Sequence, residues 1–202
     1  MNLFEDALER YLGAERLRVI QGVRVGIAGA GGLGSNVAFN LVRSGFRHLT
    51  ICDFDKVEAS NLNRQFYFSD QIGQPKVLAL QANLLRINAA IAVAPREVRV
   101  TAENAGALFA GCAVVVEAFD QAPAKRMLAE AYARSGVFYV SASGLAGWGN
   151  ADAIVTRKVH ETFTLIGDGV TAAGPGTPPC SPRVNVAAAK QADAVLAWVL
   201  RG

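Results

Sequence analysis

The sequence predicts an α/β fold with a Rossmann-like, mostly parallel sheet flanked by helices and an antiparallel C-terminal extension. Two observations support the parallel sheet. Apolar runs at residues 23–28, 48–52 and 113–117 alternate with segments of helical periodicity, as in βαβ units. A glycine-rich turn also joins the first run directly to a helix, which is typical of a nucleotide-binding unit.

The remaining elements follow from apolar spacing. We expect helices at residues 4–19, 32–44, 76–88, 103–109, 121–134 and 183–200. Further strands are expected at residues 91–100 and 137–142, and an antiparallel pair at 153–159 and 162–166. No internal repeat and no linker divides the chain, so we expect one domain over residues 1–202.

Four glycines of the first turn predict a phosphate site: Gly29, Gly31, Gly32 and Gly34. Gly29 permits the tight turn, Gly31 lets the backbone approach a phosphate, and Gly34 lets the helix pack on the strand. The free N–H groups at the helix start attract an anion. The alternative is a tight turn without a ligand, and the strand before and helix after it make this the weaker interpretation.

Asp53 lies 24 residues beyond Gly29 and ends the second apolar run, where an acidic side chain can bind ribose hydroxyls. An NAD-dependent enzyme would share this feature. The residues that follow favour a nucleoside triphosphate instead, because arginine and lysine neutralise its phosphates. These residues are Asn61, Arg64, Gln65 and Lys76.

Four motifs in this order resemble the ThiF/MoeB/HesA family, which is similar to the adenylating domain of ubiquitin-activating enzymes. They are GAGGLGS at 29–35, DFD at 53–55, SNLNRQ at 60–65 and IGQPK at 72–76. Within the family, residues 117–120, 142–147 and 182–184 most resemble the short ThiF-type sulfur carrier protein adenylyltransferases of thiamine biosynthesis.

The resemblance implies an enzyme that uses ATP to adenylate the C-terminal glycine carboxylate of a ThiS-like carrier protein ending in Gly-Gly, with release of pyrophosphate. It also implies a homodimer. Two alternatives remain open. The chain could activate another carboxylate, on a molybdopterin carrier protein, a peptide or a modified tRNA, or it could be a nucleotide-binding scaffold without turnover.

The resemblance also implies roles for individual residues. Asp53 would hold the ribose, while Asn61, Arg64 and Lys76 would contact the triphosphate and Asp120 would hold Mg²⁺. Asp55 and Gln65 complete the expected nucleotide-binding set. The catalytic residues would be Arg64, Lys76 and Asp120, because phosphoryl chemistry needs charge neutralisation and positioning. As simpler alternatives, Asp120 could only cap a helix, and Arg64 and Lys76 could be solvated charges.

The composition indicates a cytoplasmic enzyme. The net charge of +3 comes without a basic run, so we expect no nucleic-acid partner, and no long apolar segment or signal pattern predicts a membrane association. No Cys-x-x-Cys pair occurs, so no zinc is expected. Cys180 lies in a Gly/Pro-rich loop, where it is a candidate reactive thiol. The N-terminal arginine motif of longer relatives is incomplete, which leaves Arg10, Arg16 and Arg18 as candidates to act on a neighbouring subunit.

Overall fold

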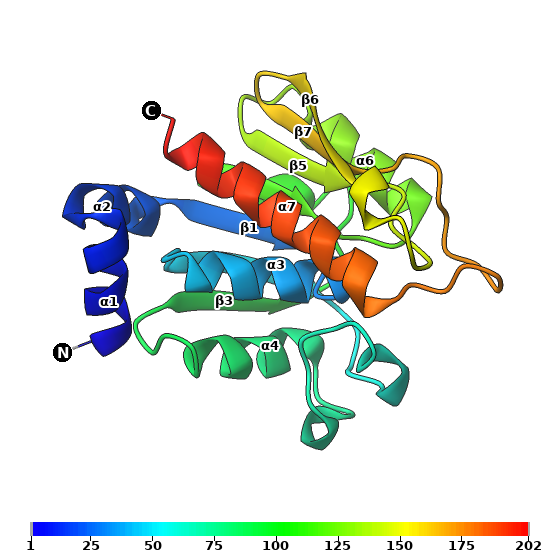
Figure 1. Cartoon of the computed structure of the whole chain (residues 1–202), viewed down its shortest axis with the longest axis horizontal. Helices are drawn as coiled ribbons and strands as arrows, with labels where there is room; N and C mark the ends of the chain where they lie inside the picture. Colours follow the sequence, from blue (N-terminus) through cyan, green and yellow to red (C-terminus); the bar gives the residue numbers. More distant parts are fainter. Residues whose placement is uncertain (1, 202) are drawn as a thin grey trace.

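The computed structural model describes residues 2–201, and its seven strands form one sheet in the order β3-β2-β1-β4-β5-β7-β6 (Figure 1). All neighbouring strands are parallel except β6, which runs antiparallel to β7. This confirms the predicted fold class, including the antiparallel extension. The strands are β1 Arg24–Ala28, β2 His48–Asp53, β3 Ala92–Glu97, β4 Val114–Glu117, β5 Phe138–Ala142, β6 Val155–His160 and β7 Phe163–Gly167.

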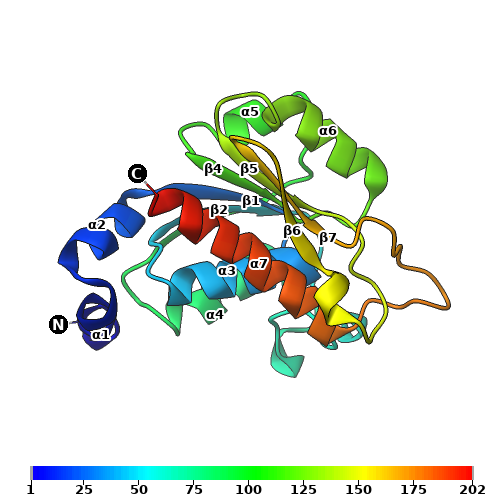
Figure 2. The same cartoon turned by 45° about the horizontal axis from the view of Figure 1, so that its top comes forward.

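Helices cover both faces of the sheet. α3, α4 and α7 lie on one face, while α5 and α6 lie on the other (Figure 2). α2 leads into the amino end of β1, and α1 lies at the same end of the sheet, where Glu5 is bonded to Arg47 before β2. The helices are α1 Leu3–Leu12, α2 Ala14–Gly22, α3 Gly32–Arg43, α4 Lys76–Leu85, α5 Ala105–Leu108, α6 Ala122–Tyr132 and α7 Ser181–Val199. Short 3-10 turns occur at η1 Ala59–Asn61, η2 Ser69–Gln71 and η3 Ala151–Ala153.

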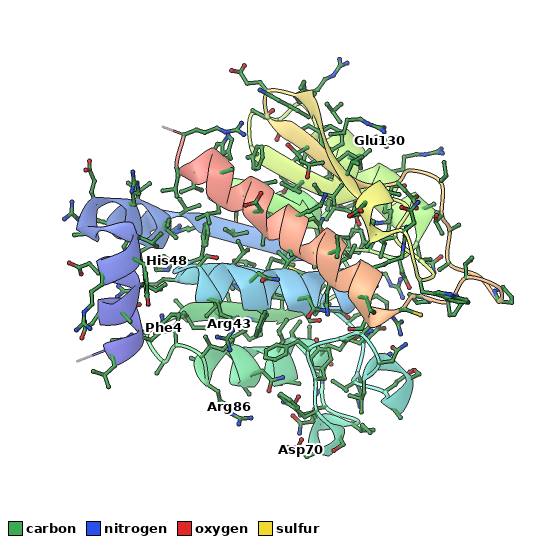
Figure 3. All side chains as sticks on the ribbon, viewed as in Figure 1. Phe4, Arg43, His48, Asp70, Arg86 and Glu130 are labelled. Carbon is green, nitrogen blue, oxygen red and sulfur yellow. The ribbon has the colours of Figure 1, made fainter. Side chains whose placement is uncertain are left out.

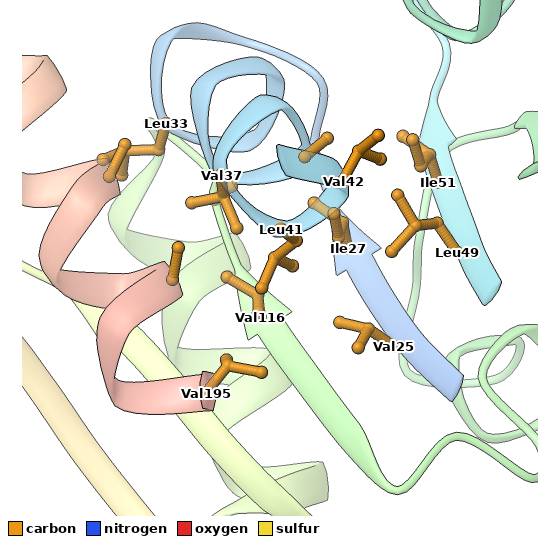
Figure 4. Packing of buried hydrophobic residues seen from close by; sticks show 14 of the residues in the cluster. Val25, Ile27, Leu33, Val37, Leu41, Val42, Leu49, Ile51, Val116 and Val195 are labelled. Carbon is orange, nitrogen blue, oxygen red and sulfur yellow. The ribbon is translucent and has the colours of Figure 1, made fainter. Parts of the chain in front are cut away.

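The main core lies between the central strands and the helix pair α3 and α7. Val25 and Ile27 of β1 point toward Val37 and Leu41 of α3, and Val195 of α7 closes the same layer (Figure 4). All five side chains are fully buried. Apolar burial of this extent is the main force that holds α3 on the strand that precedes it. The glycine turn between β1 and α3 is therefore anchored on both sides.

Three expected elements differ from their predicted bounds by three or more residues at one end, and the others differ by two residues at most. The helix expected at residues 4–19 is two helices, because Gly13 adopts a φ of 82° and ends α1. The helix expected to reach residue 88 ends at Leu85, and the strand expected at 91–100 spans only Ala92–Glu97. The domain expected over residues 1–202 has its end residues, Met1 and Gly202, outside the described range.

No helix between residues 2 and 201 combines the length and apolar character needed to cross a membrane.

Candidate active site

The glycine turn brings the start of α3 to the carboxyl ends of the strands. Gly29 has a φ of 105°, a conformation that favours glycine. A Cβ on Gly29 would lie 2.7 Å from the carbonyl oxygen of Ala118, and a Cβ on Gly34 would overlap the carbonyl oxygen of Gly29. The helix can therefore pack this closely only with glycine at both positions. Its first N–H groups lack partners within the helix and suit an anion.

Asp53 ends β2 with its carboxylate turned toward the glycine turn. Oδ2 accepts a hydrogen bond from the N–H of Ala30 at 2.6 Å, and Oδ1 accepts one from the N–H of Asp55 at 2.8 Å. Burial raises the pKa of Asp53, while these two N–H groups and the charge of Lys76 oppose the rise. The carboxylate is thus fixed beside the glycine turn, at the position that the sequence analysis expects for a ribose-binding residue.

Lys76 opens α4 and is only 6% exposed. Its Nζ lies 3.1 Å from Oδ2 of Asp55, and its N–H donates to the carbonyl oxygen of Asp55 at 2.9 Å. The Tyr67 hydroxyl lies 2.7 Å from the carbonyl oxygen of Ala30 and 3.3 Å from that of Lys76, which ties α4 to the glycine turn. The interpretation of Lys76 as a solvated surface charge is therefore wrong, because its ammonium group is buried and paired.

Arg64 and Gln65 lie against the start of α3. A Cβ on Gly31 would lie 4.0 Å from Nε2 of Gln65, whose Oε1 is buried and has no hydrogen-bond partner in the described part of the chain. Nη1 of Arg64 donates to the carbonyl oxygen of Ser60 at 3.2 Å and to Oδ1 of Asn63 at 2.7 Å. A buried amide oxygen without a partner needs an explanation, and a ligand that donates a hydrogen bond at this turn would supply one.

Asn61 has a different environment from the other predicted nucleotide contacts. It is 8% exposed, and its Oδ1 accepts a hydrogen bond from the N–H of Glu58 at 3.1 Å. Its Nδ2 lies 3.4 Å from the hydroxyl oxygen of Ser60. The side chain therefore caps η1 from within its own turn, and a contact with a nucleotide would use an amide already engaged there.

Asp120 is exposed in the loop between β4 and α6. The residue that caps α6 is Gln121, so the interpretation of Asp120 as a helix cap is wrong. Within residues 2–201, no ion pair involves Asp120, and no group of three or more metal-binding side chains occurs. A cation at this site would thus take Asp120 as its protein carboxylate and fill its other positions with phosphate oxygens and water, as Mg²⁺ commonly does.

Beneath Asp120 lies a buried ion pair to which the sequence analysis gave no role. Glu117 ends β4 with no exposed surface, and both of its carboxylate oxygens are paired with Nζ of Lys125 on α6. The carboxylate also accepts hydrogen bonds from the hydroxyl of Ser141 and the N–H of Phe119, each at 2.6 Å. The sequence signal for this ion pair is an acidic residue at the end of an apolar strand followed by a lysine in the next helix.

A group of hydrogen bonds from Arg183, here called the Arg183 clamp, joins the loop after β5 to the start of α7. Buried Arg183 donates to the carbonyl oxygens of Gly149 and Asn150 at 3.0 and 2.8 Å, and to Oδ2 of Asp168 at 2.6 Å. The loop it holds includes Trp148, which is 70% exposed. Cys180, the predicted candidate thiol, is partly exposed and directly precedes α7.

A hollow of about 300 Å³ lies away from these residues. It is lined by the first residues of β1, β2 and β3, which include Arg24 and His48, and by Cys112. His48 is the first residue of β2 and lies at the amino ends of the strands (Figure 3). Ligands of open α/β sheets bind outside the carboxyl ends of the strands, so this hollow is separate from the candidate site.

Comparison with known proteins places the chain in a family. Residues 6–193 match the ThiF family. The chain is 33% identical over 140 residues to the sulfur carrier protein adenylyltransferase of Thermus thermophilus, covering 65% of this chain and 52% of that protein. It is 36% identical over 115 residues to the molybdopterin-synthase adenylyltransferase of Salmonella typhimurium, covering 56% and 46%. The chain thus spans about half the length of these relatives.

Solved structures share the fold at lower sequence identity. The chain resembles the E. coli tRNA N6-threonylcarbamoyladenosine dehydratase, TcdA, in complex with AMP, with a TM-score of 0.87 and 19% identity over 97% of this chain and 93% of that one. The ATP complex of the same protein gives a TM-score of 0.81 and 20% identity, over 97% and 91%.

Proposed function

Because this chain belongs to the ThiF family, we propose that it is an adenylyltransferase that activates the C-terminal glycine carboxylate of a ThiS-like, ubiquitin-fold sulfur carrier protein in thiamine biosynthesis. A carboxylate oxygen attacks the α-phosphorus of ATP, and the bond from that phosphorus to the β-phosphate bridging oxygen breaks. The products are an acyl-adenylate on the carrier and pyrophosphate. The reaction takes place in the cytoplasm.

One observation carries this proposal: an anion site, a carboxylate and two cationic side chains converge at one edge of the sheet. The start of α3 supplies the anion site. The carboxylate of Asp53 accepts a hydrogen bond from the N–H of Ala30, which lies in the glycine turn. Lys76 is buried beside Asp53, and Arg64 lies over the start of α3. A dinucleotide needs the first two features, whereas a triphosphate also uses the cations.

The proposed roles follow from these positions. Asp53 holds the ribose, and the N–H groups at the start of α3 hold a phosphate. Lys76 and Arg64 neutralise the charge that accumulates on the β- and γ-phosphates as pyrophosphate leaves. Gln65 uses its unpaired Oε1 for a ligand donor at the same turn, and Asn61 joins the set after releasing the N–H of Glu58.

Asp120 is the proposed Mg²⁺ ligand. Its exposed carboxylate is a hard oxygen donor without a competing cation among residues 2–201. When bound, Mg²⁺ supplies charge neutralisation for the phosphate oxygens. The chain itself keeps Asp120 directed toward solvent, because Glu117 binds the N–H of Phe119 and so fixes the preceding residue.

The proposed partner reaches the site along the surface between the Arg183 clamp and the glycine turn. A Gly-Gly tail suits this path because it has no side chains that would collide in a narrow channel. The exposed side chain of Trp148 lies in the clamped loop and is available to cover such a tail. We also propose a homodimer, as the family resemblance implies.

One observation favours a second candidate. The match covers 93% of the chain of TcdA, which is named for a tRNA bearing N6-threonylcarbamoyladenosine, whereas the matches to the two adenylyltransferase relatives cover only 52% and 46% of those proteins. A threonylcarbamoyl group carries a carboxylate, so the same nucleotide site could activate it. The absence of a basic run in the sequence disfavours a tRNA substrate.

An exchange assay separates these candidates. Radioactive pyrophosphate is incorporated into ATP only if an acyl-adenylate forms reversibly, so the purified protein is incubated with Mg²⁺, ATP and one acceptor at a time. We expect exchange with a ThiS-like carrier and none with the same carrier lacking its last glycine. Exchange with modified tRNA alone would favour the second candidate, and nucleotide binding without exchange to any acceptor would indicate a scaffold.

A further inference from the structure

Asn36, the fifth residue of α3, connects two parts of the proposed nucleotide site. Its Nδ2 lies 2.7 Å from the carbonyl oxygen of Gly32 and 2.8 Å from the carbonyl oxygen of Arg64. One amide group carries two N–H bonds, so it can donate one to each carbonyl. The first bond is local to the helix, and the second joins the helix to a segment 28 residues away.

The segment that carries Arg64 is held to α3 by two neighbouring side chains. The hydroxyl of Ser35 donates to the carbonyl oxygen of Gly31 at 2.7 Å and accepts from the N–H of Phe66 at 3.0 Å. Asn36 holds the carbonyl of Arg64, two residues earlier in the segment. Ser35 therefore fixes one end of a three-residue stretch, and Asn36 fixes the residue whose side chain carries the charge.

Asn40 shows which of the two bonds is distinctive. It lies one helical turn after Asn36, and its Nδ2 donates to the carbonyl oxygen of Asn36 at 2.8 Å. It has no second hydrogen bond to a distant segment within residues 2–201. The local bond of Asn36 is thus an ordinary side-chain bond to a preceding helix carbonyl, whereas its bond to Arg64 has no counterpart at Asn40.

The backbone position of Arg64 matters because its side chain is long. The Cγ of Arg64 lies close enough to α3 that a Cβ on Gly32 would be 3.5 Å from it. The guanidinium itself is bound to Ser60 and Asn63 of its own loop. A shift of the Arg64 backbone would move the charged group away from a phosphate held at the start of α3, and misplacement of such a group costs rate and affinity.

We propose that Asn36 is a positioning residue that sets the location of Arg64 over the phosphate site. The inference rests on the proposed function, since it takes Arg64 as a contact of the outer phosphates. It predicts that Asn36 contributes to binding of ATP, which has those phosphates, and contributes little to binding of AMP, which lacks them.

The test compares nucleotide affinities by isothermal titration calorimetry. Asn36→Ala is expected to weaken ATP binding about tenfold and to change AMP binding less than about twofold. The matched control, Asn40→Ala, loses the same kind of local bond and is expected to change neither affinity more than about twofold. Equal losses for ATP and AMP, or no loss for either, would overturn the proposal.

A double-mutant cycle identifies the residue through which Asn36 acts. In an Arg64→Ala background, Asn36→Ala is expected to cause no further loss of ATP affinity, because the group it positions is already absent. Losses that multiply would mean a general structural role and would contradict the proposal. If Asn36→Ala unfolds, Asn36→Leu keeps the branched shape without the donors, and the same results are expected.

These binding measurements remain informative if the proposed reaction is wrong. Nucleotide affinity does not depend on turnover. ATP binding without pyrophosphate exchange would therefore contradict only the adenylation proposal. An unaltered ATP affinity in Asn36→Ala would contradict only the positioning proposal. A protein that does not bind ATP at all contradicts both.

Discussion

Nζ of Lys125 lies 3.0 and 3.1 Å from the two carboxylate oxygens of Glu117, a side chain with no exposed surface. The same ammonium group donates to the carbonyl oxygen of Ala142 at 2.9 Å. Three elements, β4, α6 and β5, therefore meet at one ion pair directly behind the loop of Asp120. Buried ion pairs contribute little net stability but fix geometry well, which suits a support for a functional loop.

Glu117→Gln is expected to destabilise the protein by about 3 kcal/mol, because it leaves the Lys125 ammonium group without its charged partner. Chemical denaturation measures the change. Glu130→Gln on the exposed face of α6 (Figure 3) is the control and should stay within about 0.5 kcal/mol. A loss in Glu117→Gln no larger than that of the control would show that the pair does not join the three elements.

The pair of Asp168 and Arg183 predicts a pH dependence. Burial acts to raise the pKa of Asp168, but hydrogen bonds from Thr171, Val170 and Arg183 outweigh it and lower the pKa to about 2. A carboxyl group whose pKa is lower in the folded state stabilises the fold above its unfolded pKa of about 3.9, and this stability is lost as the pH falls toward 2. Asp168→Asn is therefore expected to lower the midpoint temperature of thermal unfolding at pH 7. It is also expected to reduce the decrease in that temperature between pH 4 and pH 2.

Thermal unfolding at a series of pH values tests this expectation. Asp193→Asn on the exposed face of α7 is the control and should follow the unaltered protein. If the Asp168→Asn curve runs parallel to the others below pH 4, the carboxylate does not stabilise the clamp.

Gly34→Ala is expected to disrupt the glycine turn, because its Cβ would overlap the carbonyl oxygen of Gly29. We expect a loss of about 2 kcal/mol or more in the free energy of unfolding, together with loss of nucleotide binding. Gly106→Ala on α5 is the matched control, since no heavy atom lies within 4 Å of its added Cβ. Nucleotide binding by Gly34→Ala at the unaltered affinity would exclude the turn as the phosphate site.

Two substitutions test the proposed catalytic charges. Arg64→Ala is expected to lower the rate of pyrophosphate exchange by about 10²-fold, as for the loss of other groups that stabilise a transition state. Asp120→Ala is expected to abolish the dependence of the rate on Mg²⁺ together with the activity. Initial rates over a range of Mg²⁺ concentrations measure both effects, and a near-normal rate in either variant would remove that residue from the mechanism.

The sequence predicts the mostly parallel sheet, the positions of its strands and the glycine turn well, because apolar runs and glycines act locally. It predicts the placement of Asp53 beside the turn for the same reason. The break at Gly13 was missed because glycine is tolerated within helical patterns, so only its φ of 82° reveals the end of α1. The pattern of residues 4–19 gives no sign of that conformation.

Pairings between distant segments could not be predicted. The sequence predicts Lys76 as a triphosphate contact, but it does not predict the ion pair with Asp55, 21 residues earlier in the chain. Asn61 is read as a ligand contact, yet its amide caps its own turn. The partners of Lys125 and Arg183 also come from other elements, and such partners depend on tertiary packing that no local pattern encodes.

The proposed reaction begins when a carrier carboxylate attacks the α-phosphate of ATP. The most direct measurement uses ATP labelled either at the α- or the γ-phosphate, with Mg²⁺ and a ThiS-like carrier. If the proposed reaction occurs, the α-label appears on the carrier and the γ-label leaves as pyrophosphate. Release of the γ-label as inorganic phosphate, with no α-label on the carrier, would contradict it.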